Sequence, residues 1–127
     1  MQWNYQNKII QEINDLPEGA FGFIYQTTHT PTGKKYIGKK LFTKAGYRQI
    51  KGKKKKIRKA SDWLNYWGSN EELQKEVIKN GEDQYTKEIL YLCKTRSACN
   101  YWETWEIFNH FIYHDYFIML IRAINII

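Results

Sequence analysis

The sequence predicts a small α+β domain in which an antiparallel sheet is flanked by helices. Three patterns predict it: a β-hairpin over residues 21–42, a helix over 71–80, and a strand over 85–94 that leads into a helix over 96–114. A hairpin, a helix, a strand and a helix in this order are typical of the α+β class. The chain has 127 residues, enough for one hydrophobic core but not two, so 1–127 is treated as a single domain with its core at about 20–112.

The hairpin is predicted from two strand-like segments joined by turn residues. "AFGFIYQTTH" is rich in aromatic and β-branched residues, and "KKYIGKKLF" has the same character. Pro31 and Gly33 between them suit a tight connection. Gly38 lies inside the second strand, where a glycine often marks a place that another group approaches closely.

Two helices are predicted between the hairpin and the next strand. Ser61 is a plausible N-cap for a short helix over 61–67. The helix over 71–80 has Ser69 or Asn70 as its cap, acids in its first turn, and an end at Asn80-Gly81. Its apolar residues fall on one stripe: Leu73, Val77 and Ile78.

The last predicted elements are a strand over 85–94 and a helix over 96–114. Helical spacing places one group of residues on a shared apolar face: Tyr101, Trp105, Phe108 and Ile112. A second group falls on a different face: Glu103, Glu106 and His110. The apolar tail over 113–127 is too short to span a bilayer and is expected to pack as a last strand or helix.

The charge of the chain favours a polyanionic partner. The formal net charge is +7 and the pI is about 9.3. Residues 39–60 are predicted to form a mobile basic loop, because 39–59 contain eleven Lys or Arg and no acid. Basic residues interleaved with aromatics favour a nucleic-acid groove over a merely solvated charge run. The candidate contacts are Lys39, Lys44, Lys53, Lys54, Lys55, Lys56, Lys59, Trp63 and Tyr66. No basic amphipathic helix or secretory signal points to a membrane.

Tyr25 and Tyr36 are the first candidates for chemistry. An antiparallel pair can bring residues at this spacing onto one face of the sheet. There, beside Lys39 and Lys40, two phenols would hold a phosphate oxygen or a water, and the lysine charge would lower a tyrosine pKa. The alternative is that both rings only pack the sheet.

Glu103 is the second candidate, as a ligand for Mg²⁺. Magnesium takes only one or two protein carboxylates and completes its octahedron with water and phosphate. Glu106 is the rival, and the alternative is a solvated helix acid. His110 and His114 have an i, i+4 spacing that suits zinc, but a third ligand is not evident.

The two cysteines, Cys93 and Cys99, are expected to be reduced core thiols. Two cysteines alone are too few for the usual four-ligand structural zinc site.

Together these residues resemble the GIY-YIG nuclease family. Its first triplet is present as Phe23-Ile24-Tyr25, with phenylalanine in place of glycine, and its second is intact as Tyr36-Ile37-Gly38. More narrowly, "GFIYQTTHTPTGKKYIGKK", the basic tract, "SDWLNYWGSN" and "YWETWE" are similar to endonucleases of this family carried by tailed bacteriophages. The resemblance covers roughly residues 20–110.

The resemblance implies a small three-stranded antiparallel sheet with helices around it. It also implies metal-dependent hydrolysis of DNA phosphodiesters, with Mg²⁺ or Mn²⁺ as cofactor. Carried over by position, Tyr36 would activate water, Tyr25 would orient water and phosphate, and Glu103 would hold the metal. Lys40 stands where the family often has a basic residue.

Two positions depart from the family pattern. The family arginine, about ten residues beyond the second tyrosine, is replaced by Gly46, so Arg48 and Arg58 both remain candidates. No asparagine stands about fifteen residues after Glu103, since Asn109 is too near and Asn125 too far.

Two hypotheses follow from these observations. The first is a metal-dependent endonuclease acting on double-stranded DNA, in the cytoplasm of a bacterial host if it is phage-encoded. The second is a nucleic-acid-binding module that keeps the fold without the chemistry. The chain has no room for a separate DNA-reading domain, so we expect specificity to be low or to come from a homodimer or a partner.

Overall fold

The structure is a computed structural model that describes the backbone of residues 2–68 and 70–114 and the side chains of 2–68 and 70–110. The predicted apolar tail over 113–127 therefore lies almost wholly outside the described residues. Of the helices in the described part, none is both long enough and apolar enough to cross a membrane.

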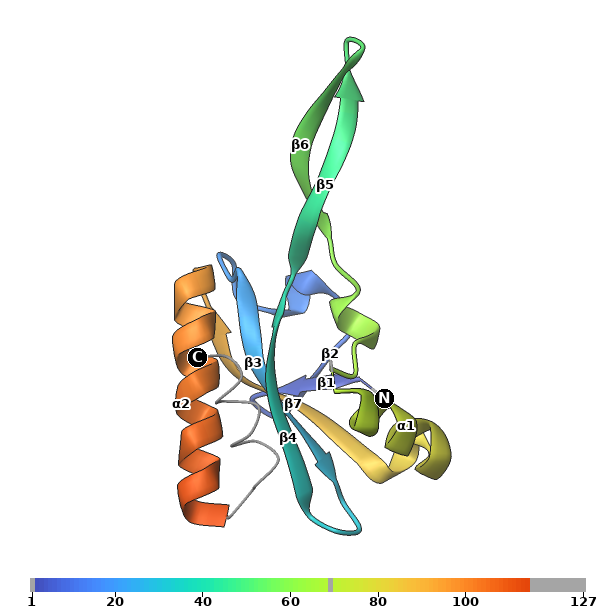
Figure 1. Ribbon diagram of the computed structural model, residues 1–127, viewed down its shortest axis with the longest axis vertical. Coiled ribbons are helices and arrows are strands. Elements are labelled where there is room, and N and C mark those ends of the chain that lie inside the picture. The colour runs from blue at the N-terminus through green and yellow to red at the C-terminus, as the bar shows by residue number, and fades with distance from the viewer. Residues whose placement is uncertain (1, 69, 115–127) are drawn as a thin grey trace.

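The main sheet has five strands in the order β2-β1-β7-β3-β4 (Figure 1). Their bounds are β1 Trp3–Tyr5, β2 Lys8–Ile10, β3 Gly22–His29, β4 Lys34–Leu41 and β7 Tyr85–Cys93. The three strands that the sequence predicted form the antiparallel set β7-β3-β4. The prediction of a three-stranded, purely antiparallel sheet is wrong, because β1 adds parallel to β7 and β2 adds beyond it.

The added strands come from a small hairpin at the N-terminus. Its turn residues Gln6 and Asn7 both have positive φ, 50° and 67°, the conformation that matches the twist of a tight hairpin. Trp3 anchors the hairpin: its side chain is buried, and its indole N–H donates to the Trp63 carbonyl at 2.7 Å. Strands of three residues carry too little alternation to be recognised in the sequence.

The register between β3 and β4 places both tyrosines on one face of the sheet. Tyr25 is paired with Gly38, and Thr27 is paired with Tyr36, so the two tyrosines are diagonal neighbours. A Cβ at Gly38 would lie 2.6 Å from Cζ of Tyr25. The close approach predicted at Gly38 is therefore confirmed, and the approaching group is the Tyr25 ring.

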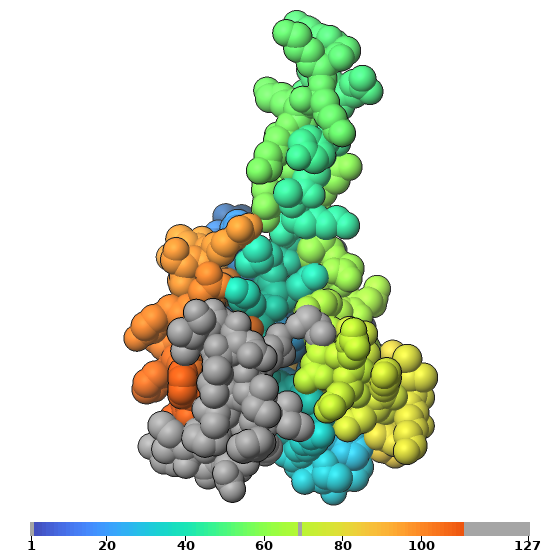
Figure 2. All heavy atoms as spheres, in the orientation of Figure 1, coloured from blue at the N-terminus to red at the C-terminus, as the bar shows by residue number. Residues whose placement is uncertain are grey.

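The basic segment 39–60 is not a mobile loop, as the sequence predicted, but a two-stranded antiparallel ribbon. Its strands are β5 Thr43–Ile50 and β6 Lys53–Ala60. Lys51 and Gly52 connect them with φ of 51° and 75°, again the turn that suits a hairpin. The ribbon projects beyond the body of the molecule (Figures 1 and 2).

Helices cover the two faces of the sheet separately (Figure 1). On the tyrosine face lie the 3-10 helix η2 Trp63–Asn65 and the helix α1 Glu71–Asn80, while α2 Arg96–His114 covers the other face. Two further 3-10 turns are η1 Ile13–Asp15 and η3 Glu82–Gln84.

Helix α1 confirms its predicted range and end. Asn70 is the cap, because its side chain accepts hydrogen bonds from the backbone N–H groups of Glu72 and Leu73. Leu73 and Val77 are buried as expected, but Ile78 is 84% exposed and does not share their stripe.

The short helix predicted over 61–67 is a single 3-10 turn whose cap is Asp62 rather than Ser61. The Ser61 hydroxyl instead donates to the Leu41 carbonyl at 2.6 Å, which ties the base of the ribbon to the end of β4.

Helix α2 has the predicted range but buries a different face. Tyr101 and Trp105 are 65% and 51% exposed. The residues that α2 buries are Cys99, Glu103, Glu106 and Ile107. Of the two faces that helical spacing predicts, the one with Glu103 and Glu106 meets the sheet, and the aromatic one lies mostly outward. Ile112 has a side chain outside the described part of the chain.

Candidate functional site

Tyr36 lies at the rim of the tyrosine face, in contact with α1. Its hydroxyl donates a 2.8 Å hydrogen bond to Oε2 of Glu76, and Nζ of Lys34 lies 3.4 Å from Oε1 of the same carboxylate. The side chains of Lys34 and Glu76 are about one-third exposed. The arrangement joins a phenol, a carboxylate and an ammonium group at the edge of the core: Tyr36 is only 5% exposed, and solvent reaches the group through Lys34 and Glu76.

The pKa of Tyr36 is raised above its ordinary value. Burial of the ring is the main cause, and the hydrogen bond to Glu76 adds to it, while Lys34 opposes both. The expected lowering of a tyrosine pKa by nearby lysines is therefore wrong for Tyr36. At neutral pH this residue is a neutral phenol held by a proton acceptor.

Tyr25 is packed inside the protein. Its side chain is 1% exposed, and its ring meets Trp3 and Tyr66 edge to face at centroid distances of 5.4 and 6.0 Å. Its hydroxyl lies between Gly38 and Gly68, where a Cβ on Gly68 would come within 2.9 Å of it. For Tyr25 the packing interpretation fits the geometry better than contact with solvent and phosphate.

Lys39 and Lys40 point to opposite sides of β4. Lys40 lies on the tyrosine face, with Nζ 2.7 Å from Oδ1 of Asp62 and 4.0 Å from the ring centroid of Tyr66. The Lys40 hydrogen bond lowers the pKa of Asp62. Lys39 instead donates to the side-chain oxygen of Asn100 on α2.

Glu103 and Glu106 lie on the side of α2 that packs against the sheet, on the sheet face opposite the tyrosines. Their side chains are only 3% and 5% exposed. Oε2 of Glu106 lies 3.6 Å from Nε2 of His110, and a hydrogen bond to Glu106 raises the pKa of Tyr91. The structure does not bring Tyr36 and Glu103 together.

The thiols of Cys93 and Cys99 occupy the same buried layer. Both are free, as the sequence predicted. A hydrogen bond between them, together with burial, raises the pKa of Cys99, and the Glu103 charge adds to the effect. The same hydrogen bond lowers the pKa of Cys93, so Cys99 is the thiol that keeps its proton and donates it to Cys93.

The residues do not fit one metal centre shared by the tyrosines and Glu103. A single carboxylate is chemically sufficient for Mg²⁺, but Glu103 is almost fully buried on the wrong side of the sheet for Tyr36. Within residues 2–68 and 70–110, no group of three or more His, Cys, Asp or Glu side chains is placed to hold a metal. The predicted pairing of His110 with His114 falls outside this range, because the His114 side chain lies outside the described residues.

A concavity of about 370 Å³ lies where the ribbon leaves the sheet, and its charged lining is wholly basic. Its lining residues are Lys39, Lys40, Leu41, Thr43, Lys44, Ala45, Arg58, Ser61 and Arg96. Arg58 is held there by hydrogen bonds to the Thr43 carbonyl at 2.8 Å and to its hydroxyl at 3.0 and 3.1 Å. Arg48 is not part of it. The concavity suits a phosphate group.

Arg96 in this concavity was missed by the sequence analysis. It is the first residue of α2, where the positive end of the helix dipole usually favours an acid. A basic residue at the start of a predicted helix could have indicated a binding site for an external anion.

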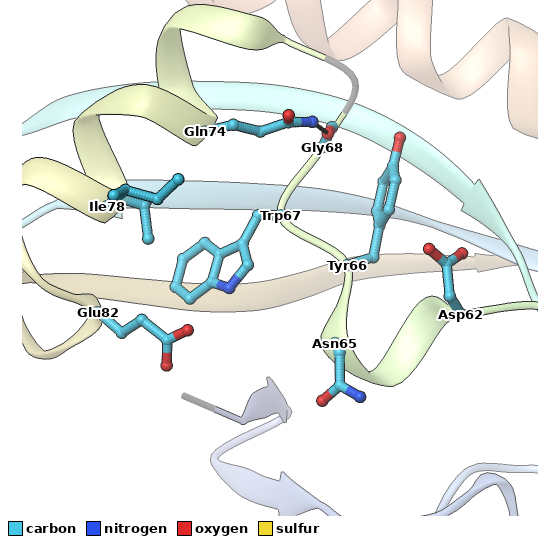
Figure 3. A pocket seen from close by; sticks show the side chains of 9 residues that line it. Asp62, Asn65, Tyr66, Trp67, Gly68, Gln74, Ile78 and Glu82 are labelled. Atoms are coloured by element: carbon cyan, nitrogen blue, oxygen red, sulfur yellow. Dashed lines mark hydrogen bonds between the residues drawn. The ribbon is translucent and has the colours of Figure 1, made fainter.

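A second concavity, of about 360 Å³, has a different character (Figure 3). Asp62 and Glu82 lie at either end of it, with Tyr66 and Trp67 between them. The Gln74 side chain donates to the Gly68 carbonyl at 2.6 Å across its rim. Two carboxylates make this hollow unsuited to phosphate.

The remaining predicted nucleic-acid contacts divide between ribbon and core. Lys44, Lys53, Lys54, Lys55, Lys56 and Lys59 all lie on the ribbon. Trp63 is only 5% exposed and packs against Phe42 at a centroid distance of 4.9 Å. Its predicted role as a surface contact is therefore not supported. Tyr66 is half-buried beneath Lys40.

Comparison with protein families matches residues 3–116 to the family described as "Putative endonuclease segE, GIY-YIG domain". Searches of curated proteins and of solved structures gave no significant match. The matched range includes the N-terminal hairpin, both tyrosine triplets, the ribbon and all of α2. The chain therefore belongs to the GIY-YIG endonuclease family.

Proposed function

We propose that this chain is an endonuclease that hydrolyses phosphodiester bonds of double-stranded DNA and requires Mg²⁺ or Mn²⁺. The observation that carries the proposal, beyond the family, is the hydrogen bond from the Tyr36 hydroxyl to Glu76. A phenol fixed to a proton acceptor on the strand of the second triplet is suited to activating water. The basic ribbon and concavity begin at the end of the same strand.

In the proposed reaction Tyr36 acts as a neutral proton relay. The water oxygen forms a bond to phosphorus as its proton passes to the Tyr36 oxygen. The phenol proton passes to Oε2 of Glu76. The bond from phosphorus to the leaving oxygen breaks, and that oxygen takes a proton from solvent. Because the pKa of Tyr36 is raised, a relay suits the site better than a standing phenolate. General-base help of this kind contributes roughly 10²–10⁴-fold to a rate.

The cations of the basic concavity are proposed to hold a neighbouring phosphate of the DNA backbone, because Lys40 lies four residues along β4 from Tyr36, about 13 Å at about 3.3 Å per residue. Arg58 is preferred over Arg48 for this contact, because Arg58 lines the concavity and is held by Thr43. Lys40 lies beside it and is proposed to contact the same phosphate.

The metal ligand is left to a direct comparison. Glu103 is proposed from the family pattern, with Glu106 as its rival, and Glu76 is the carboxylate that lies beside Tyr36. No step of the relay described above passes through the ion.

The test is cleavage of supercoiled plasmid by the purified chain with Mg²⁺, Mn²⁺ or EDTA. Wild type is expected to nick or linearise the plasmid only with a divalent ion. Tyr36→Phe is expected to lose that activity, and comparison of Glu103→Gln, Glu106→Gln and Glu76→Gln across metal concentrations identifies the carboxylate on which the divalent ion depends. Intact plasmid with folded protein in every metal would reject the proposal.

A second function is favoured by one observation: Tyr36 and Glu103 lie on opposite faces of the sheet. A GIY-YIG domain without a working centre would bind nucleic acid and leave it uncut. It predicts salt-dependent binding that neither Glu103→Gln nor Tyr36→Phe changes. Single- and double-stranded RNA and DNA compared side by side would identify its target.

A further inference from the structure

The ribbon of β5 and β6 has two faces of different character. Side chains alternate between faces along each strand, and directly paired residues share a face. One face, here called the lysine face, carries Lys44, Arg48, Lys53, Lys55 and Lys59. The other, called the tyrosine-47 face, carries Tyr47, Gln49, Lys54, Lys56 and Arg58.

Two of the three cations of the tyrosine-47 face, Lys54 and Arg58, have partners inside the protein. Nζ of Lys54 lies 4.8 Å from the ring centroid of Tyr47. The Arg58 guanidinium donates to Thr43 and also lies 5.6 Å from the ring centroid of Phe21. This face is therefore partly occupied by contacts within the chain.

The lysine face has like charges directly opposite each other. Lys44 is paired with Lys59, and Arg48 is paired with Lys55. Like charges in directly paired positions destabilise a sheet. The ribbon contains no Asp or Glu to offset them. In the described part of the chain, none of the five cations forms a hydrogen bond or an ion pair; Lys44 has only a longer-range attraction to Asp62. Among the described residues, no acid therefore lies close enough to offset this repulsion by an ion pair.

Gly46 keeps the lysine face smooth near its base. A Cβ at Gly46 would lie 2.7 Å from Cδ of Lys59, so the lysine stem lies flat across the ribbon at this position. The only other uncharged residues on this face are Ile50 and Ile57. The result is a narrow cationic surface without bulky aromatic groups.

The dimensions of the ribbon suit one groove of duplex DNA. Eight residues a strand give a length of about 26 Å at about 3.3 Å per residue. The major groove of B-DNA, about 12 Å wide and 8.5 Å deep, admits a two-stranded ribbon, whereas the minor groove is only about 6 Å wide. The ribbon also stands clear of the sheet and helices (Figure 2), so the body does not block its approach.

We propose that the β5–β6 ribbon docks in the major groove of double-stranded DNA through its lysine face. This inference rests on the proposed function for its DNA substrate, and it adds the element, the face and the groove. DNA phosphates relieve the repulsion between Lys44 and Lys59 and between Arg48 and Lys55. The ribbon thus supplies a DNA-binding element within the GIY-YIG domain itself.

The test measures binding to a labelled duplex in EDTA, so that cleavage plays no part. Two double variants remove the same charge from opposite faces: Arg48→Gln/Lys55→Gln and Lys54→Gln/Lys56→Gln. At about 0.1 M salt the first is expected to bind about tenfold more weakly than the second. Its plot of log K against log salt is expected to lose about two in slope, since each phosphate contact contributes about 0.9. Equal loss from both faces, with both variants folded by circular dichroism, would overturn the proposal.

The groove is tested by dimethyl sulfate footprinting, which reports both grooves in one reaction. Guanine N7 lies in the major groove and adenine N3 in the minor groove. Bound wild type is expected to protect guanine N7 and leave adenine N3 reactive. Protection of adenine N3 alone, or stronger binding to anionic vesicles than to duplex, would contradict the inference. Face-dependent binding without plasmid cleavage would reject the nuclease proposal alone, and cleavage with face-independent binding would reject the docking proposal alone.

Discussion

The Tyr36 hydroxyl donates to the Glu76 carboxylate at 2.8 Å and thereby links β4 to α1. The sequence offers no hint of this pair, because forty residues separate the two side chains. The contact gives the second tyrosine of the family pattern a proton acceptor and fixes the direction of its phenol. Removal of the Glu76 carboxylate should therefore change both the cleavage rate and the pKa of Tyr36.

Glu76→Gln is predicted to reduce plasmid cleavage by roughly 10²–10⁴-fold, because the amide no longer accepts the phenol proton. The pKa of Tyr36 should fall, since the Glu76 hydrogen bond helps to raise it. NMR titration of tyrosine labelled at Cζ, assigned by Tyr36→Phe, measures the pKa. Glu72→Gln on the exposed side of α1 is the matched control. Unchanged cleavage by Glu76→Gln would remove the relay from the account.

The cap of α1 is predicted to support the same pair. Asn70→Ala removes the acceptor for two backbone N–H groups and is expected to cost about 1 kcal/mol of unfolding free energy. Asn70→Asp should retain most of the stability, because its carboxylate also accepts these hydrogen bonds. Urea denaturation of the three proteins measures the difference. Equal loss in both variants would show that the side-chain cap does not stabilise the helix.

Gly38→Ala is predicted to destabilise the fold by about 1–3 kcal/mol, the usual range for an overpacked core. The added Cβ would meet the Tyr25 ring. A double-mutant cycle with Tyr25→Leu should therefore show strong coupling, because the smaller side chain makes room for the methyl group. Additive effects in thermal or urea unfolding would mean that the Tyr25 ring is not what requires glycine here.

Lys87 is predicted to make the unfolding free energy depend on pH in the alkaline range. Its side chain is fully buried between Trp3 and Trp67, with Nζ 4.2 and 4.7 Å from their ring centroids. Burial lowers its pKa from 10.5 to about 8. Between these values the unfolded chain holds the proton and the folded chain has lost it, so stability should rise from about pH 8 to 10.5 by up to about 3 kcal/mol.

The control for this prediction is Lys87→Met, which removes the titrating group and keeps most of the volume. As the pH rises from about 8 to 10.5, the unfolding free energy of wild type should increase relative to that of Lys87→Met. A difference that stays flat would show that Lys87 keeps an ordinary pKa.

Local patterns predicted the elements that have strong sequence signals. The hairpin over 21–42, the helix that ends at Gly81 and the strand over 85–94 all follow from turn, cap and alternation chemistry. The N-terminal hairpin was missed because each of its strands has only three residues. The basic ribbon was missed because repulsion between lysines favours a loop. In the structure, the Lys51-Gly52 turn and the backbone pairing of β5 with β6 form a hairpin despite that repulsion.

The candidate site was less predictable, because it depends on which face each side chain takes. The sequence identified Tyr25 and Tyr36 but not that Tyr25 is enclosed by two glycines. Phe23, which replaces the first glycine of the triplet, fills an aromatic cluster with Trp3 and Phe42 at centroid distances of 5.0 and 5.1 Å. Helical spacing cannot say which stripe of α2 meets the sheet, so the burial of Glu103 required the structure.

Single-turnover cleavage of a labelled duplex in Mg²⁺, with wild type and Tyr36→Phe at saturating protein, isolates the role of the Tyr36 hydroxyl. Wild type is expected to cleave the duplex, Tyr36→Phe to lose at least about hundredfold in rate, and both to bind the duplex equally. Cleavage by Tyr36→Phe at the wild-type rate would contradict this role, as would an uncut duplex bound tightly by folded wild type.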